Sequence, residues 1–319
     1  MIQMTESVFF SSNGQNEIYY REYLPDAEPK AIVQLAHGVA EHILRYDHFA
    51  RYLASQGYIV VGNDHLGHGR SLREKGELGW FGDNQGWERL VEDMHTLHIQ
   101  TARRHPGLPY FLFGHSMGSF LARTYVIRYG SGLDGVILSG TGHQSKALLN
   151  AGYAIGKMEC RRHGTRYRSE KFNDLLFGKN NAGYSVVHTA YDWLSRDDGV
   201  VSEYVNDPLC GFLPTVGLLR DMLDGMLFIT RQKNIVRMRK DLPVYFMSGD
   251  CDPVGENGKG VIRAYKAFLA AGMKDVTMKL YASGRHEMLN ELNRDEVYRD
   301  ITAWLDAKCG KLGQLSAGR

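Results

Sequence analysis

The sequence predicts a mostly parallel α/β sheet of eight strands, flanked by helices and interrupted by one inserted helical cap. Short apolar runs alternate with helix-length amphipathic stretches along most of the 319 residues. Continuous apolar strands that alternate with helices indicate a parallel sheet buried on both faces. A β-rich hairpin precedes the alternation, and a stretch of roughly a hundred residues without a clear strand interrupts it, which is far longer than an ordinary connection.

Local sequence marks each of these elements. "SVFFSS" and "EIYYREYLP" are β-rich and are separated by "NGQN", which is typical of a hairpin turn. Apolar runs predict six further strands at residues 31–38, 58–65, 110–114, 134–140, 243–249 and 277–282. Amphipathic stretches predict helices at residues 48–57, 87–105, 119–130 and 260–272.

The stretch without strands is interpreted as a helical cap at residues 141–240, so that residues 1–140 and 241–319 form the core domain. Six apolar residues recur in the cap at helical spacing and form one stripe. Two interpretations stay open: the stripe packs the cap onto the sheet domain, or part of it lines an acyl-chain pocket, for which methionines are well suited. The stripe consists of Leu218, Leu219, Met222, Leu223, Met226 and Leu227.

Composition and charge exclude several classes of protein. A formal net charge of +2 gives no reason to expect nucleic acid as a partner. No uncharged apolar run reaches the roughly 18–20 residues of a membrane span, and no signal-peptide pattern opens the chain. The four cysteines stand far apart, which argues against a zinc site and a disulfide framework and fits a reducing compartment. Nucleotide-binding glycine motifs are missing as well. We therefore expect a soluble, cytoplasmic protein without a cofactor.

The stretch "FLFGHSMGSF" places Ser116 between Gly114 and Gly118, after an apolar strand and before a helix. A loop that merely needs small residues is one interpretation. The other is a G-x-S-x-G nucleophile elbow, whose glycines permit a turn too tight for side chains. Such a turn raises the serine hydroxyl at a helix N-terminus, where developing negative charge is stabilised. The flanking strand and helix favour the nucleophile.

A serine nucleophile needs a base and an acid, and both are found at later strand ends. His286 follows the strand at 277–282, which gives the chain order serine, acid, histidine. "GDCDPV" offers Asp250 and Asp252 after the preceding strand. Asp252 is preferred because it stands three residues beyond the strand-end glycine, in the loop, and Asp250 is interpreted as a turn-capping residue.

The oxyanion of an acyl-transfer reaction needs backbone donors. We expect one from Met117, directly after the nucleophile, and one from Val39, in the loop after the strand at 31–38. The stretch "GNDHLGHGRS" brings Asp64, His65 and His68 close together. Either these residues bind a metal or they form a structural loop that supports the site, and the adjacent glycines favour the loop.

Five motifs together resemble the monoacylglycerol lipase and lysophospholipase branch of the α/β-hydrolases. They are "HGVAEHILRY", "DHLGHGRS", "GHSMG", "GDCDPV" and "GRHE". The resemblance implies a sheet with a helical cap, a triad of Ser116, Asp252 and His286, and oxyanion donors at Val39 and Met117. It also implies two-step hydrolysis of lipid-like carboxylic esters without a metal or an organic cofactor.

Two other functions remain open at this stage. An amidase or aminopeptidase of the same fold would need an acidic group to hold a free amino terminus, and the cap offers four candidates. A binding protein without catalysis would be expected to lack part of the triad, and all three residues are present. We also predict transient contact between the stripe of the cap and a lipid surface. The four acidic candidates are Glu159, Glu170, Asp174 and Asp192.

Overall fold

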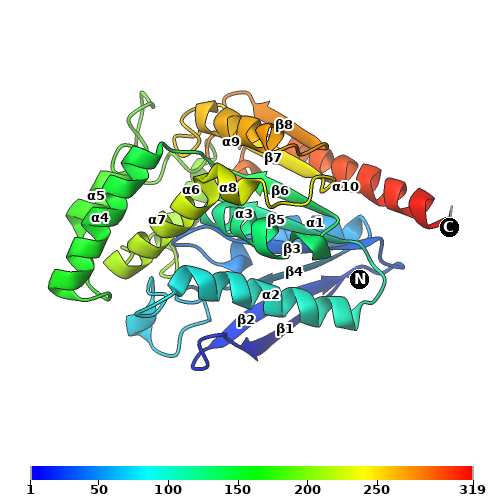
Figure 1. The fold of residues 1–319 in the computed structure, drawn as a ribbon, viewed down its shortest axis with the longest axis horizontal. Helices are drawn as coiled ribbons and strands as arrows, with labels where there is room; N and C mark the ends of the chain where they lie inside the picture. The colour runs from blue at the N-terminus through cyan, green and yellow to red at the C-terminus, as the bar shows by residue number, and fades with distance from the viewer. Residues whose placement is uncertain (1, 318–319) are drawn as a thin grey trace.

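The computed structural model describes residues 2–317, and these residues contain one sheet of eight strands (Figure 1). The strands lie in the order β1-β2-β4-β3-β5-β6-β7-β8. β1 pairs antiparallel with β2, β2 pairs antiparallel with β4, and all remaining pairs are parallel. The bounds are β1 Gln3–Phe10, β2 Glu17–Leu24, β3 Ala31–Ala36, β4 Tyr58–Asn63, β5 Tyr110–His115, β6 Gly135–Ser139, β7 Val244–Gly249 and β8 Val276–Tyr281.

The eight predicted strands and the fold class are confirmed. Every residue of β3, β4, β5, β6 and β7 is buried, which agrees with their continuous apolar sequences. β5 lies at the centre of the sheet, between β3 and β6. Because ligands bind beyond the carboxyl ends of parallel strands, the loop after β5 is placed for chemistry.

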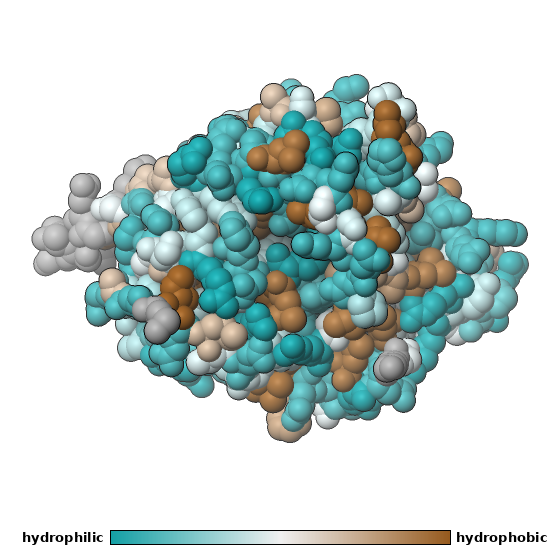
Figure 2. Space-filling view, turned by 180° about the vertical axis from the view of Figure 1, so that it is seen from behind, coloured by the Kyte–Doolittle hydropathy of each residue, from teal (hydrophilic) through white to brown (hydrophobic). Residues whose placement is uncertain are grey.

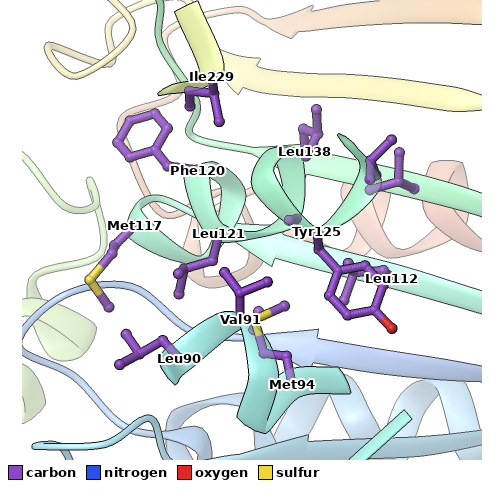
Figure 3. Close-up of a cluster of buried hydrophobic side chains, with 14 of the residues drawn as sticks. Leu90, Val91, Met94, Leu112, Met117, Phe120, Leu121, Tyr125, Leu138 and Ile229 are labelled. Carbon is purple, nitrogen blue, oxygen red and sulfur yellow. The ribbon is translucent and has the colours of Figure 1, made fainter. Parts of the chain in front are cut away.

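Helices cover both faces of the sheet. One core cluster joins α2, α3 and α9 to one face, and a second cluster joins α1 and α10 to the other. Figure 3 shows the first cluster, in which Val91 and Met94 of α2 lie near Leu121 and Tyr125 of α3. The bounds are α1 Asp47–Ser55, α2 Gly86–Arg104, α3 Met117–Tyr129, α9 Lys259–Ala270 and α10 Arg294–Ala317, with short 3-10 turns at η1 Ile43–Tyr46, η2 Lys75–Glu77, η3 Gly130–Gly132 and η4 Met288–Asn290.

Five helices lie between β6 and β7 in the part of the chain that the structure describes, and α4, α5 and α7 lie on the left side of the molecule in Figure 1. α7 packs against α3 and α2, and α4 packs against α7. We propose that residues 141–240 act as the cap that the sequence predicts. The bounds are α4 Lys146–His163, α5 Glu170–Phe177, α6 Asp198–Asn206, α7 Val216–Thr230 and α8 Gln232–Ile235.

The apolar stripe of the cap lies on α7 and is buried. Its six side chains are 0–7% exposed and belong to the same core cluster as α3 and β5. The stripe therefore packs the cap onto the sheet domain. It is not a surface for lipid, because buried side chains cannot contact a membrane, and the prediction that gave it this role was wrong.

The outer surface of the chain carries a second set of apolar residues. Most of the large apolar side chains that are exposed lie between residues 141 and 240. Figure 2 shows separate apolar patches among hydrophilic residues on the face that it presents. The exposed apolar residues of this range are Leu148, Met158, Tyr167, Leu175, Val186, Val187, Val205 and Val236.

Two further expectations bear on the surroundings of the protein. Among residues 2–317, no helix is both long enough and apolar enough to cross a membrane. The four cysteines, all within the described range, are free thiols.

Candidate active site

Ser116 occupies the turn between β5 and α3. Its backbone has φ 52° and ψ −121°, a conformation that side chains rarely adopt. A Cβ atom at Gly118 would lie 2.0 Å from the carbonyl oxygen of Ala36, and one at Gly114 would lie 2.4 Å from the carbonyl oxygen of Gly118. β5, α3 and the neighbouring strand β3 approach one another too closely for side chains at Gly114 and Gly118. The turn thus stores strain at the one residue that carries a hydroxyl.

His286 and Asp252 form a buried pair. The Nδ1 atom of His286 lies 2.9 Å from Oδ1 of Asp252, and both side chains are almost completely buried. Asp252 also accepts hydrogen bonds from the backbone N–H of Val254 at 2.9 Å and from the Ser248 hydroxyl at 3.1 Å. The aspartate is therefore fixed on three sides. Asp250 is exposed and does not take this place.

The pair shifts the pKa values of both members. Burial is the largest influence on His286 and lowers its pKa, but the charge and hydrogen bond of Asp252 outweigh it, so the pKa is raised above its usual value. Burial likewise raises the pKa of Asp252, and the charge and hydrogen bonds of its partners, His286 first, reverse this and lower it. Asp252 therefore stabilises the protonated imidazole, which is what a general base requires of its partner.

Ser116 and His286 both line one cavity of about 380 Å³. Within the described residues the structure contains no hydrogen bond between the Ser116 hydroxyl and the imidazole. Such bonds are often long in enzymes without substrate and tighten when substrate binds. The common cavity brings the two side chains to the same space, whereas Asp252 lies behind the histidine.

The loop after β3 presents the backbone amide of Val39 without a hydrogen-bond partner among the described residues. Gly38 N–H donates to Oε1 of Glu41, and Ala40 N–H donates to Nε2 of His68 at 3.2 Å. Among the described residues, no acceptor is bonded to Val39 N–H, between them. Met117 is the first residue of α3, where N–H groups lack a partner within the helix. These two amides are free for a ligand.

The stretch 64–71 lies beneath this loop and holds it in place. Asp64 accepts hydrogen bonds from the backbone N–H groups of Ile43 and Arg70. His37, His65 and His68 pack together as three buried rings: His37 lies tilted against His65, with 4.2 Å between centroids, and edge-on to His68. Burial lowers the pKa of His65 to about 3 and that of His68 to about 4, so these rings are neutral at ordinary pH. Neutral, buried rings, of which His37 and His68 bond to backbone groups, suit the supporting role that the sequence favours.

A buried charge network beside the site was not predicted. Arg45 donates to both carboxylate oxygens of Glu287, at 2.6 and 2.7 Å, and to Glu41 at 2.8 Å. Burial raises the pKa of Glu287, but the charge and hydrogen bonds of Arg45 outweigh it and lower the pKa to about 2. The network links the loop after β3 to the residue next to His286. An i,i+4 pair of Glu41 and Arg45 in apolar surroundings was the available signal.

The cap also contacts the histidine loop directly, which the sequence could not reveal. The backbone N–H of His286 donates to the carbonyl oxygen of Trp193 at 3.3 Å, and that of Glu287 donates to Leu194 at 2.7 Å. The indole of Trp193 packs on the His286 ring, with 4.9 Å between centroids. The His115 ring also packs on the His286 ring, with 4.7 Å between centroids. The cap thus helps to hold the imidazole.

The cavity has both apolar and polar lining, and the cap supplies most of its residues. Aromatic and aliphatic side chains form about half of the lining. The cap adds the polar side chains of Asn173, Asp174 and Asn181, and Glu41 and Glu287 of the charge network line the cavity as well. Among the described residues, the α7 stripe does not line it, and of the four acidic candidates only Asp174 does. The apolar part of the lining includes Phe177, Tyr191, Trp193, Leu194, Phe212, Leu213 and Pro214.

A family model described as serine aminopeptidase, S33 (Hydrolase_4), matches residues 27–293. This range contains the serine turn, the buried pair and the cap. The chain belongs to this family. The family resemblance that the five motifs indicate is thereby confirmed at the level of the α/β-hydrolase branch that includes the monoacylglycerol lipases.

Curated relatives and solved structures agree with this placement. A monoacylglycerol lipase of Mycolicibacterium smegmatis is 30% identical over 313 residues, which cover 96% of this chain and 99% of that protein. A monoglyceride lipase homolog of monkeypox virus is 41% identical over 291 residues, covering 90% and 94%. A thermostable carboxyl esterase from Bacillus coagulans superposes with a TM-score of 0.90 at 31% identity, covering 97% of this chain and all of that one. The chain is a carboxylic ester hydrolase.

Proposed function

We propose that Ser116 attacks the carbonyl carbon of a lipid-like ester, with His286 as general base and Asp252 as its partner. The observation that carries the proposal is the buried Asp252–His286 pair, which ends at the cavity that Ser116 lines. A serine hydroxyl is a poor nucleophile without such a base. The strained turn keeps the hydroxyl raised at the N-terminus of α3.

The reaction proceeds in two acyl transfers. The Ser116 oxygen bonds to the ester carbon while its proton moves to Nε2 of His286, and Asp252 stabilises the imidazolium. The carbon–oxygen bond to the alcohol then breaks, and the alcohol leaves with the proton from His286. Water repeats the sequence on the acyl-enzyme, which releases the carboxylic acid and restores the serine.

The free amides of Val39 and Met117 stabilise the negative oxygen of each tetrahedral intermediate. Donors of this kind act in a site with little water, where removal of one donor costs about 10²–10³-fold in turnover. The two amides come from the loops after β3 and β5, which are adjacent strands. The hydrogen bonds from Gly38 N–H to Glu41 and from Ala40 N–H to His68 hold the loop after β3 in this conformation.

The substrate that best fits the cavity is a monoacyl ester of a small neutral polyol. The apolar part of the lining accommodates an acyl chain, and the polar side chains of Asn173, Asp174 and Asn181 offer hydrogen-bond partners for hydroxyl groups. The carboxylate of Asp174 repels a phosphodiester, so a monoacylglycerol fits better than a lysophospholipid. The names of the relatives from M. smegmatis and monkeypox virus support the same substrate class.

Hydrolysis of a p-nitrophenyl ester series, from acetate to long acyl chains, tests the proposal. Ser116→Ala is expected to lose nearly all turnover. Ser119→Ala is the matched control, because that hydroxyl lies one helical turn further on and only donates to the carbonyl oxygen of Ser116. Equal rates for wild type and Ser116→Ala, or no turnover in either, would contradict the assignment of the nucleophile.

An aminopeptidase remains a second candidate because Asp174 lines the cavity. A free amino terminus would need such a carboxylate. Parallel assays of monoacylglycerol, lysophospholipid and aminoacyl amide distinguish the possibilities. The ester function predicts that the wild type prefers monoacylglycerol and that Asp174→Asn gains activity on lysophospholipid. Loss of amide cleavage in Asp174→Asn, with the ester rate unchanged, would support the peptidase instead.

We further propose that exposed apolar residues of the cap make transient contact with a lipid surface. Leu148, Leu175, Val186 and Val187 are the most suitable, because each is exposed and lies in the cap. Vesicle flotation tests this contact. Binding that decreases in Leu175→Ser with Val186→Ser is expected, whereas no binding by the wild type would contradict it.

A further inference from the structure

Three metal-ligating side chains from distant parts of the chain meet beside the candidate active site. They are His42, at the end of the loop after β3, and Asp207 and Cys210, which follow α6 in the cap. Nε2 of His42 lies 2.7 Å from Oδ2 of Asp207. One donor atom from each residue lies within 4.8 Å of the other two. Local sequence does not predict this cluster, because His42 lies 165 residues before Asp207, which is three residues before Cys210.

The backbone around the cluster is already held in place. The carbonyl oxygen of Ala40 accepts hydrogen bonds from Gly211 N–H at 2.9 Å and from the Tyr204 hydroxyl at 2.8 Å. Cys210 N–H donates to the carbonyl oxygen of Asp207 at 3.0 Å. The loop after β3 and the cap are therefore joined on either side of the three side chains, which limits the entropy that a bound ion would have to remove.

Two of the donors lack a full set of partners. His42 is 5% exposed, and its Nδ1 atom is buried without a hydrogen bond in the described part of the chain. Cys210 is 7% exposed, and no hydrogen bond involves its thiol within residues 2–317. Buried polar atoms without partners are uncommon and call for an explanation. A metal ion would supply the partner of the Cys210 thiol, whereas an ion bonded at Nε2 of His42 would leave Nδ1 unpartnered.

The donor set matches one kind of ion. Imidazole, carboxylate and thiolate together are typical ligands of Zn²⁺. Tetrahedral zinc with its usual bond lengths separates its ligand atoms by about 3.4–3.6 Å, so these donors need to move by only about 1 Å. The Asp207 side chain is 31% exposed, which leaves a path for the ion and room for water as the fourth ligand.

We propose that His42, Asp207 and Cys210 bind one zinc ion, which fastens the loop after β3 to the cap and slows turnover. On binding, the Cys210 thiol releases its proton to water and the thiolate bonds to zinc. The His42 proton moves from Nε2 to Nδ1. Nε2 then bonds to zinc and no longer donates a hydrogen bond to Asp207, whose carboxylate also bonds to zinc. No electron is transferred. The bound cation is balanced by one thiolate and one carboxylate.

The bond to zinc restricts the segment that carries Val39, three residues before His42. That segment supplies a donor to the reacting carbonyl in the proposed mechanism. Zinc is thus an inhibitor in this scheme and takes no part in the chemistry. The binding itself does not depend on the proposed function, and it is measured separately from activity.

Reduced, metal-free protein titrated with Zn²⁺ in a calorimeter gives the stoichiometry, and Cd²⁺ reports thiolate ligation through its ultraviolet charge-transfer band. One ion per chain and a cadmium–thiolate band are expected for the wild type. Cys210→Ser is expected to lose the band and to bind zinc about 100-fold more weakly. Asp207→Asn keeps an acceptor for His42 and is expected to bind zinc more weakly without unfolding. Cys251→Ser, a half-buried cysteine next to Asp250, is the matched control and is expected to behave like the wild type.

A band that persists in Cys210→Ser, a band lost in Cys251→Ser, or no binding by the wild type would overturn the site. The inhibitory role has its own test, the hydrolysis of a short-chain ester with and without zinc. Cys210→Ser is expected to keep the metal-free rate and to lose the inhibition. Zinc that binds at Cys210 and leaves the rate unchanged would overturn the inhibitory role alone. Absence of turnover in all proteins would contradict the ester substrate and leave the binding result intact.

Discussion

The Nε2 atom of His68 accepts a hydrogen bond from the backbone N–H of Ala40, at a distance of 3.2 Å. The other ring nitrogen, Nδ1, lies 3.2 Å from the carbonyl oxygen of Leu66, which fixes the neutral tautomer that can accept from Ala40. Ala40 itself has a positive φ of 55°. A strained residue next to Val39 is therefore held by one buried imidazole, and the shape of the loop depends on it.

His68→Leu is expected to lower kcat by about 10-fold or more, with a smaller effect on KM. Leucine fills the space but leaves Ala40 N–H without an acceptor, which costs about 1–3 kcal/mol in a buried site. The loop can then relax away from the geometry that the proposed oxyanion donor requires. Steady-state kinetics on a soluble ester and urea unfolding measure the two effects.

His65→Leu is the matched control for this prediction. The His65 ring is equally buried, but neither of its nitrogens has a hydrogen-bond partner among the described residues. Its loss should affect stability through packing alone and affect kcat less than the loss of His68. Equal reductions of kcat in both variants would mean that the histidine cluster matters for packing and does not position Ala40.

Periodicity was sufficient to predict the sheet and most of the helices that cover it. β3, β5 and β7 are continuous apolar runs, and the bounds of each of these three strands lie within one or two residues of the predicted range. Local sequence and burial determine such elements, so a single chain reveals them. The serine turn was predictable for a similar reason, because its glycines meet a steric requirement within a few residues.

The contacts between distant segments could not be predicted in the same way. The bond from His286 to Trp193 and the ion pair of Arg45 with Glu287 join parts of the chain that share no local pattern. The helical stripe on α7 was equally compatible with core packing and with a ligand wall. Periodicity identifies a buried face, but only the packing of α7 on α3 decides what covers that face.

Asp252→Asn is expected to lower kcat by about 10³–10⁴-fold, as the loss of the triad acid does in serine proteases. The pH profile gives a sharper test. In the proposed mechanism His286 must be neutral to accept a proton, so kcat/KM of the wild type is expected to rise with pH through a histidine pKa above 6.5. Without the charge of Asp252, burial dominates, the pKa falls, and the acid limb of the profile moves to lower pH.

Asp250→Asn is the control for this profile, because Asp250 is exposed and lies two residues away. It should leave both the rate and the acid limb close to those of the wild type. An acid limb that stays in place in Asp252→Asn would show that another group titrates there. A large loss of rate in Asp250→Asn would instead mean that Asp250, and not Asp252, is the acid.

A third prediction concerns stability in acid and rests on the ion pair of Arg45 and Glu287. The pKa of Glu287 is about 2 in the folded protein, against 4.5 as its ordinary value. A carboxylate with a lowered pKa stabilises the fold fully above its unfolded-state value, and this contribution is lost as the pH falls toward its folded-state value. Glu287→Gln should therefore cost about 3 kcal/mol at neutral pH, and the difference from the wild type should shrink between pH 4.5 and pH 2.

Urea unfolding of both proteins across this pH range measures the difference. Glu74→Gln is the control, because Glu74 forms an ion pair with Arg166 at the surface, where its side chain is 65% exposed. Surface pairs of this kind contribute about 0–1 kcal/mol, so its effect should be small at every pH. If the loss of unfolding free energy in Glu287→Gln stays constant down to pH 2, its cause is lost packing, because packing does not depend on protonation. If this loss disappears in acid, the stabilisation comes from the charge of Glu287. The ion pair with Arg45, which joins the loop after β3 to the residue beside His286, is then its source.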